Sequence, residues 1–161
     1  MEAPRAIQDA YADDVSHCYG CGQLNEHGLH IRSYWQGDEV VCHFKPAPYH
    51  TVMPGYVYGG LIAALIDCHS AAAAAAGAAR AAGREPDEGE LDRYVTASLR
   101  VDYLRPTPLG ETLVLTARVR AITSRKLVVA TSLAAAGQER ARGEAVLVRM
   151  PEGWAKGAEG A

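Results

Sequence analysis

One apolar segment, residues 54–80 (PGYVYGGLIAALIDCHSAAAAAAGAAR), combines residue types that can do chemistry. Two glycines, Gly59 and Gly60, stand at the head of a predicted helix, and Asp67 follows two turns later. Free backbone N–H groups at a helix N-terminus stabilise anionic oxygen, and glycine lets a carbonyl approach them because no side chain intrudes. The pair is therefore a candidate oxyanion site, although a tight entry turn alone also accounts for two glycines.

Asp67 is the second candidate, because a carboxylate among leucine, isoleucine and alanine is costly unless it has a partner or a function. It can deprotonate water or attack a carbonyl itself, and a hydrogen bond from a neighbouring strand is the structural alternative. Eight helical residues separate it from Gly59, about 12 Å at roughly 1.5 Å per residue. Either the site is shared between two chains or one assignment is wrong.

The residues that follow Asp67 are weaker candidates for the site. Ser70, three positions on, lies on a similar helix face and can position water, although a helical serine more often bonds to its own backbone. Cys68 and His69 are not expected to form a nucleophile–base pair, because consecutive helical residues point about 100° apart.

The cysteines raise the question of a metal. Cys18 and Cys21 in HCYGCG have half of a zinc-site spacing, and the second half would have to come from residues such as Cys42 and His43. We expect reduced thiols, including Cys68, with no bound metal and a packed N-terminal knuckle instead.

Length and composition limit the class of protein. The 161 residues fit one domain, and 48% hydrophobic residues, 22% charged residues and a net charge of -3 give no indication of a nucleic-acid or anionic-membrane surface. The acidic N-terminus lacks the basic-then-apolar order of a secretory signal, so we expect a cytoplasmic protein. Residues 1–28 are predicted to be an N-terminal extension that ends in the CxxCG knuckle, with 1–17 forming a tail or a short helix packed on the outside; 29–150 are predicted to be the core and 151–161 a tail.

The elements that must hold these residues follow from periodicity. A hairpin is predicted before one long helix over residues 56–82, and four strands in meander after it. Such a sheet must carry the helix across one face, which is an α+β fold. In the first strand after the helix, alternation places Val95, Ala97, Leu99, Val101 and Tyr103 on one face. The predicted strands are 29–35, 40–44, 94–106, 111–122, 125–136 and 138–150.

Four segments together resemble the hotdog-fold acyl-CoA thioesterases of the phenylacetate-degradation type. They are the glycine pair with Asp67, VDYLRPTPLGE at 101–111, SRKLVVAT at 124–131 and CYGCGQLNEHGL at 18–29. The resemblance implies a curved antiparallel sheet of five to six strands around one long central helix. It also implies hydrolysis of an aryl- or medium-chain acyl-CoA to free acid and CoA, with no cofactor beyond the CoA of the substrate. It implies a homodimer in which two sheets are joined edge to edge, and the assembly of such dimers into a tetramer.

For this reaction we expect Asp67 to be the base or nucleophile. Because Asp67 and the glycine pair are too far apart along one helix, we expect the two glycines that hold the oxyanion to come from the partner chain. Tyr58 stands where most members have a histidine; its hydroxyl can donate a hydrogen bond but does not titrate near neutral pH. His50 or Thr51 stands near the position of a polar family residue.

Three cations are candidates for the phosphates of CoA: Arg105, Arg125 and Lys126. Solvated charges at strand ends are the structural alternative. Two other functions stay open at this point. One is acyl-CoA binding without turnover, suggested by Tyr58, and the other is a hydratase or dehydratase on the same fold.

Overall fold

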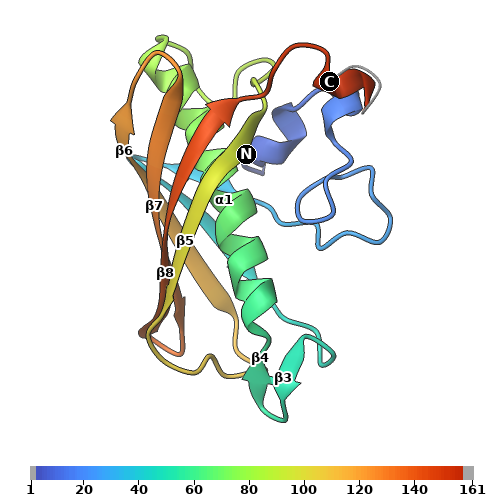
Figure 1. The fold of residues 1–161 in the computed structure, drawn as a ribbon, viewed down its shortest axis with the longest axis vertical. Helices are drawn as coiled ribbons and strands as arrows, with labels where there is room; N and C mark the ends of the chain where they lie inside the picture. Colours follow the sequence, from blue (N-terminus) through green and yellow to red (C-terminus); the bar gives the residue numbers. More distant parts are fainter. Residues whose placement is uncertain (1–2, 158–161) are drawn as a thin grey trace.

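The computed structural model describes residues 3–157 and has one long helix, α1 (Gly59–Ala81), against a curved antiparallel sheet of six strands (Figure 1). This arrangement confirms the predicted hotdog fold. The strands of the sheet are β1 (Tyr34–Gln36), β2 (Glu39–Phe44), β5 (Tyr94–Tyr103), β6 (Leu113–Ile122), β7 (Lys126–Ala135) and β8 (Gln138–Arg149). A small second sheet pairs β3 (Thr51–Met53) with β4 (Tyr56–Val57), and three 3-10 helices complete the chain: η1 (Ile7–Ala10), η2 (Asp13–Val15) and η3 (Trp154–Lys156).

The strand order differs from the predicted meander. Strands run β1-β2-β6-β7-β8-β5, so β6, β7 and β8 form a meander, but β5 pairs with β8 and lies at the edge of the sheet. The connection over residues 104–112 carries the chain from the edge strand β5 past β8 and β7 to the inner strand β6. With β2 and β5 on opposite sides of the central strands, the sheet curves around α1, which contacts both.

The first strand and the helix both begin later than predicted. Residues 29–33 are not a strand, because Leu29 and Ile31 donate their N–H groups to the carbonyls of Tyr19 and Gly20 in the N-terminal loop. The helix begins at Gly59 and not near residue 56, because Tyr56–Val57 pairs with β3 around a turn in which Gly55 has φ +88°.

The alanine-rich half of α1 packs closely in the core, because alanine side chains are short. A Cβ at Gly77 would lie 2.6 Å from Val119 on β6, so helix and sheet approach more closely here than a larger residue allows. By length and composition α1 could span a membrane, but 78% of its most apolar window is buried inside the fold. It is the core helix of the domain.

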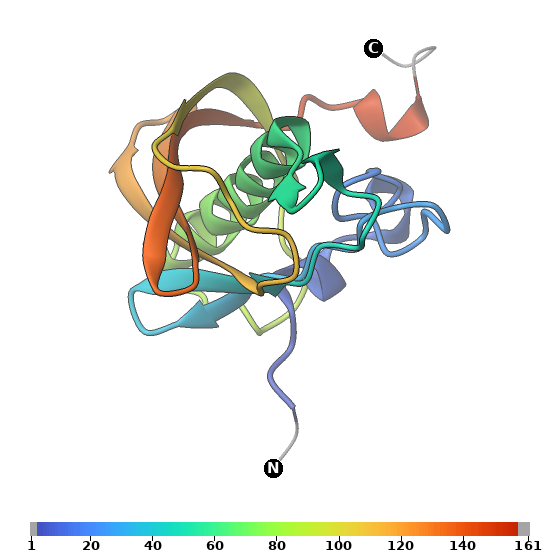
Figure 2. The same ribbon diagram turned by 90° about the horizontal axis from the view of Figure 1, so that it is seen from below.

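The N-terminal segment is part of this core, which corrects the expectation that it packs on the outside. Ile7, Ala10 and Tyr11 are buried in one cluster with the alanines of α1. Figure 2 shows the N-terminal loops on the side of α1 away from the main sheet. The helix is therefore enclosed by the sheet on one side and by residues before β1 on the other.

A register shift in β5 changes which residues face the helix. Thr96 pairs with Leu147 and Ser98 with Val146, so Ala97 is an extra residue, as in a β-bulge. Ala97 is exposed, although simple alternation places it on the inner face. Before the shift, the side chain of Thr96 turns toward α1; after it, Leu99 packs against the core. Tyr103, also predicted inward, is 55% exposed.

Candidate active site

The head of α1 is framed by two tyrosines. Tyr58 precedes the helix with extended backbone angles, and no side chain of the described residues caps the first turn. Its ring lies across Gly60, where a Cβ would be 2.3 Å from a ring carbon. On the other side, Tyr103 donates a hydrogen bond of 2.8 Å from its hydroxyl to the carbonyl of Gly59. At Gly60 any larger residue would displace the Tyr58 ring, whereas a Cβ at Gly59 would only touch the Tyr103 ring, at 3.4 Å.

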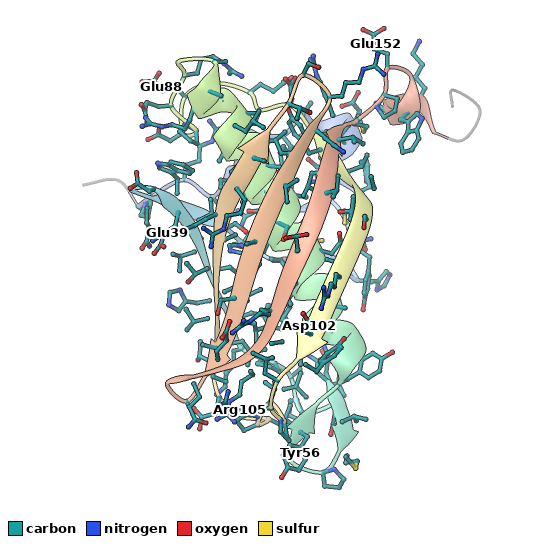
Figure 3. The ribbon with its side chains drawn as sticks, turned by 60° about the vertical axis from the view of Figure 1, so that its left-hand side comes forward. Glu39, Tyr56, Glu88, Asp102, Arg105 and Glu152 are labelled. Atoms are coloured by element: carbon teal, nitrogen blue, oxygen red, sulfur yellow. The ribbon has the colours of Figure 1, made fainter. Side chains whose placement is uncertain are left out.

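A cavity of about 240 Å³ opens beside this helix head. Its walls include Gly59, Ile62, Tyr103 and Arg105. The Arg105 guanidinium donates a hydrogen bond of 3.2 Å to the carbonyl of Glu139 on β8, and this bond holds the side chain against that strand. Figure 3 shows Arg105 near Tyr56 at this end of the molecule. A positive side chain and the positive end of the helix dipole thus share one cavity, an arrangement that suits an anionic ligand.

His50 supports the segment that leads into the helix. Its Nδ1 accepts a hydrogen bond of 2.9 Å from the N–H of Ala47, and its carbonyl accepts one of 2.9 Å from the N–H of Tyr58. The Tyr49 ring packs edge-on against the imidazole at a centroid distance of 4.8 Å. Because Nδ1 accepts, the neutral ring carries its proton on Nε2. His50 therefore positions Tyr58 through the backbone.

Asp67 is held from the edge strand and opens into a second cavity. It is half-buried, and its carboxylate accepts a hydrogen bond from the hydroxyl of Thr96 on β5. The cavity, of about 280 Å³, is lined by Asp67, Cys18, Cys68, Arg93 and Thr96 among others. The predicted bond from a neighbouring strand thus exists, and it leaves the carboxylate accessible from the cavity.

The other polar residues in the middle of the helix point elsewhere. The hydroxyl of Ser70 forms a hydrogen bond of 2.8 Å with that of Thr131 on β7, and both residues are buried. Ser70 does not line the cavity beside Asp67, so the described structure gives no geometric support for its predicted role in positioning water. His69 is buried between Ser33 Oγ at 2.8 Å and the carbonyl of Val40 at 3.0 Å. Cys68 lies against Cys18, so Cys68 and His69 form no dyad, as expected.

Burial lowers the pKa of His69 to about 4, because the charged imidazolium loses its hydration and gains no anionic partner. The carbonyl of Val40 can only accept, so Nε2 carries the proton and Nδ1 accepts from the Ser33 hydroxyl. Gln8 completes the network through two hydrogen bonds to Ser33. His69 thus connects α1 to β2 and to the N-terminal segment.

The three cations predicted to bind CoA do not form one surface within a chain. Arg105 lies at the helix head, whereas Arg125 lies in the exposed turn between β6 and β7 and Lys126, also exposed, begins β7. Leu127, the next residue, packs near Gly77 in the last third of α1. Eighteen helical residues separate Gly59 from Gly77, about 27 Å at roughly 1.5 Å per residue.

The cysteines gather in a way that the sequence analysis did not anticipate. The Sγ atoms of Cys18, Cys21 and Cys68 all lie within 4.8 Å of one another, whereas Cys42 is buried on β2 outside this group. Hydrogen bonds donated by the other two thiols hold the pKa of Cys18 well below its usual range, and donating those bonds raises the pKa of Cys21 and of Cys68. The partner of the Cys18–Cys21 pair is Cys68 of the helix, and not Cys42 with His43.

Sequence analysis also missed Thr96, Tyr103 and Arg93. The first two belong to the strand that was predicted, but the register shift and the turn at its end decided which way they point. Arg93 precedes β5 in a stretch without a pattern, and no local signal distinguishes it. Within one chain, the carboxylate of Asp67 and Gly59 of the helix head open into different cavities.

Comparison with known proteins adds family information. The model of the thioesterase superfamily matches residues 54–142. The acyl-coenzyme A thioesterase THEM4 of Xenopus laevis is 36% identical over 88 residues, which are 55% of this chain and 34% of that protein. The chain thus spans about a third of the length of this curated relative.

Solved structures agree with the fold. The chain is 43% identical to a thioesterase superfamily protein from Shewanella loihica PV-4, with a TM-score of 0.68 over 89% of this chain and 99% of that one. The PaaI protein of the phenylacetic acid degradation operon of E. coli is 18% identical, with a TM-score of 0.60 over 76% of this chain and 81% of that one.

Proposed function

Because the chain belongs to the thioesterase superfamily, we propose that it hydrolyses an acyl-CoA thioester to the free acid and CoA, with an aryl or medium-chain acyl group. The observation that carries the proposal is Asp67: a carboxylate in the middle of the core helix, held by Thr96 and open to a cavity of about 280 Å³. The similarity to an acyl-coenzyme A thioesterase supports the choice of substrate class.

In the proposed reaction, Asp67 accepts a proton from water as the water oxygen adds to the thioester carbonyl. The negative charge that develops on the carbonyl oxygen is stabilised by N–H groups at the head of a second helix. The C–S bond then breaks, the thiolate of CoA leaves, and the proton held by Asp67 passes to sulfur. Direct attack by the Asp67 carboxylate on the carbonyl, followed by hydrolysis of the anhydride, is the alternative first step.

The separation along the helix favours a site made by two copies of this chain. Asp67 and Gly59 are about 12 Å apart along α1, at roughly 1.5 Å per residue, and they open into different cavities. β5 is one edge of the six-stranded sheet, and Ala97 and Ser98, which follow the Thr96 that bonds to Asp67, are exposed on it. A second copy paired along this edge can bring its helix head to Asp67, so we propose a homodimer as the smallest active unit, with tetramers formed from it.

Tyr58 has a defined part in this proposal. Its ring covers Gly60, and its hydroxyl oxygen would be 2.6 Å from a Cβ at that position, so the hydroxyl lies beside the first N–H groups of the helix. From there it can donate a hydrogen bond to the thioester oxygen as a third donor. In this proposal Tyr58 only donates a hydrogen bond, and the proton transfers are assigned to Asp67.

A panel of acyl-CoA thioesters, assayed for release of free thiol, tests the proposal. We expect turnover of at least one aryl or medium-chain substrate, and a loss of at least about 100-fold in kcat in Asp67→Asn, since this variant keeps the shape of the side chain and removes the base. Binding of acyl-CoA without thiol release by the wild-type protein would contradict hydrolysis and would favour a binding protein.

A further inference from the structure

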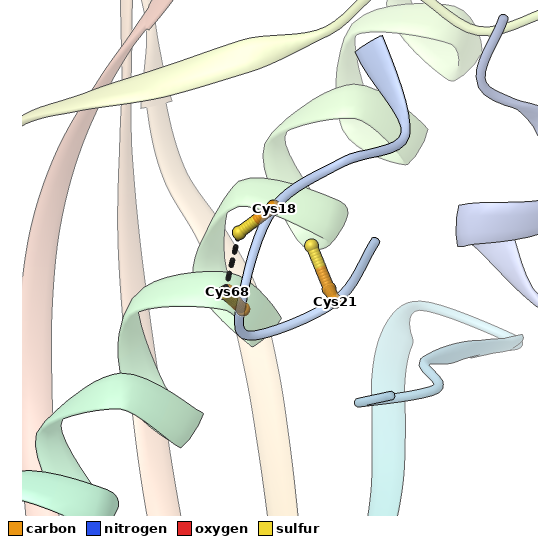
Figure 4. A group of neighbouring side chains, drawn as sticks. All are labelled: Cys18, Cys21 and Cys68. Atoms are coloured by element: carbon orange, nitrogen blue, oxygen red, sulfur yellow. Dashed lines mark hydrogen bonds between the residues drawn. The ribbon is translucent and has the colours of Figure 1, made fainter. Parts of the chain in front are cut away.

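Three thiols from two distant parts of the chain meet beside α1. Cys18 and Cys21 belong to the loop after η2, and Cys68 lies in the middle of the helix (Figure 4). All three Sγ atoms lie within 4.8 Å of one another, and those of Cys18 and Cys68 are 3.8 Å apart. A disulfide needs about 2.05 Å, so none of these pairs is bonded.

The spacing suits a tetrahedral metal ion. With a Zn–S bond of about 2.3 Å and tetrahedral angles, two thiolates of one zinc site lie about 3.8 Å apart. The separation between Cys18 and Cys68 has this value, and Cys21 needs to approach by less than about 1 Å to match it. The C-x-x-C spacing at residues 18–21 is that of a zinc-binding knuckle.

The loop that carries the first two thiols is built to reach the helix. A Cβ at Gly20 would lie 2.3 Å from the Sγ of Cys68, and one at Gly22 would lie 2.4 Å from the backbone nitrogen of Cys18. The backbone N–H groups of Gly20 and Cys21 also point at the Sγ of Cys18. Any larger residue at position 20 would push the loop away from Cys68, so the contact between the loop and the helix depends on this glycine.

Arg93 supplies charge balance. It donates a hydrogen bond of 3.4 Å from Nη2 to the Sγ of Cys21, and the Tyr11 ring lies 4.7 Å from its guanidinium carbon. Its Nη1 is buried without a hydrogen-bond partner, and among residues 3–157 no carboxylate forms an ion pair with it. Three thiolates and one divalent cation carry a net charge of -1, which the guanidinium neutralises. A half-buried arginine beside three neutral thiols has no such compensation.

We propose that Cys18, Cys21 and Cys68 bind one zinc ion through three thiolates, with the fourth coordination position open to the cavity that Asp67 also lines. Each thiol releases its proton to solvent as its sulfur binds the ion. The ion would tie the N-terminal loop to the middle of α1. This replaces the expectation of a metal-free knuckle, because the third ligand comes from the helix. The proposal does not depend on thioester hydrolysis, and its test uses no thioester.

The first experiment uses the wild-type chain, expressed with zinc and purified under reducing conditions without chelators. We expect one zinc per chain by elemental analysis, and an X-ray absorption spectrum with three sulfur neighbours at about 2.3 Å. A shell made only of nitrogen and oxygen would overturn the proposal. So would a reduced protein that takes up no zinc from a zinc salt.

The second experiment compares two buried cysteines with the same substitution. Cys68→Ser removes a proposed ligand, whereas Cys42→Ser changes a cysteine of the same core cluster that lies outside the thiol group. Zinc affinity, measured in competition with a chromophoric chelator, should fall by about 100-fold or more in Cys68→Ser and stay within about threefold of wild type in Cys42→Ser. Equal affinity of the two variants would refute the assignment. If Cys68→Ser does not fold, the sulfur count of the wild-type spectrum decides.

Discussion

Mixing two inactive variants tests whether Asp67 of one chain works with the helix head of another. Asp67→Asn removes the base and keeps an oxygen that can accept the hydrogen bond from Thr96, so the fold is retained. Gly59→Val acts at the other end of the proposed site. A Cβ at Gly59 would already lie 3.4 Å from the Tyr103 ring, and the two further methyl groups extend into the cavity of about 240 Å³ beside the helix head. We expect each homodimer to lose at least about 100-fold in kcat.

The expected recovery follows from counting sites. Unfolding and refolding an equal mixture makes about half of the dimers mixed, by random assortment of two kinds of chain. A mixed dimer has one site with both substitutions and one with neither, because the intact aspartate and the intact glycine come from opposite chains. About a quarter of wild-type activity should therefore return.

The assay is thiol release from an accepted acyl-CoA, with each variant taken alone through the same refolding as the control. If each site lay within one chain, every site in a mixed dimer would keep one defect, and the mixture would show only the mean of the two residual activities. That result would refute the pairing of Gly59 with Asp67. A recovery near a quarter is not expected from any arrangement in which one chain supplies both groups.

Three further predictions concern the effect of single substitutions on kcat, on KM and on the pH dependence of stability. Tyr58→Phe should lower kcat about tenfold with little change in stability, because it removes only a hydrogen-bond donor. Tyr58→His keeps a donor and should preserve the wild-type activity. Equal kcat values in all three proteins would show that the hydroxyl has no role. Arg105→Ala should raise the KM for acyl-CoA about five- to tenfold in steady-state kinetics. Arg125→Ala is the matched control, because it removes a charge that lies away from the helix head. An unchanged KM in Arg105→Ala would contradict binding of acyl-CoA in the cavity beside the helix head. His69 has a folded pKa lowered to about 4, so the folded state binds fewer protons than the unfolded state between pH 6.5 and 4, and stability present above pH 6.5 is lost as the pH falls through this range. Denaturant unfolding should show wild type losing about 2 to 3 kcal/mol more than His69→Gln between pH 7 and 4.5, and parallel pH profiles would exclude this role.

Local patterns account for most of the elements. The alternation of apolar and polar residues predicted β6, β7 and β8 within a few residues, because each strand has one face on the core. The helix was predicted with its C-terminal end at Ala82, one residue past the observed end, because Gly83 follows in a left-handed conformation that ends the helix. Its first residue was missed by three positions, since the pairing of β4 with β3 competes with helix for Tyr56 and Val57.

For the candidate site, too, the sequence indicates some of the residues, and the tertiary structure decides their partners. Asp67 and the glycines could be singled out from the sequence, because a carboxylate in an apolar helix and a glycine pair at its head are unusual wherever the rest of the chain lies. The direction of each side chain within the helix also follows from local geometry, which is why Cys68 and His69 point to different partners. The partners themselves do not follow from it.

Only the tertiary structure decided which segments meet. The pairing of β5 with β8, the extra residue at Ala97 that turns Thr96 toward Asp67, and the contact of Cys68 with a loop 50 residues earlier all join parts of the chain whose local patterns are independent. Such contacts are selected by how completely the sheet closes around the helix and how well the enclosed side chains pack. A periodic pattern specifies which face of a strand is buried, but it leaves open which strand lies beside it and which polar group of that neighbour comes within hydrogen-bonding distance.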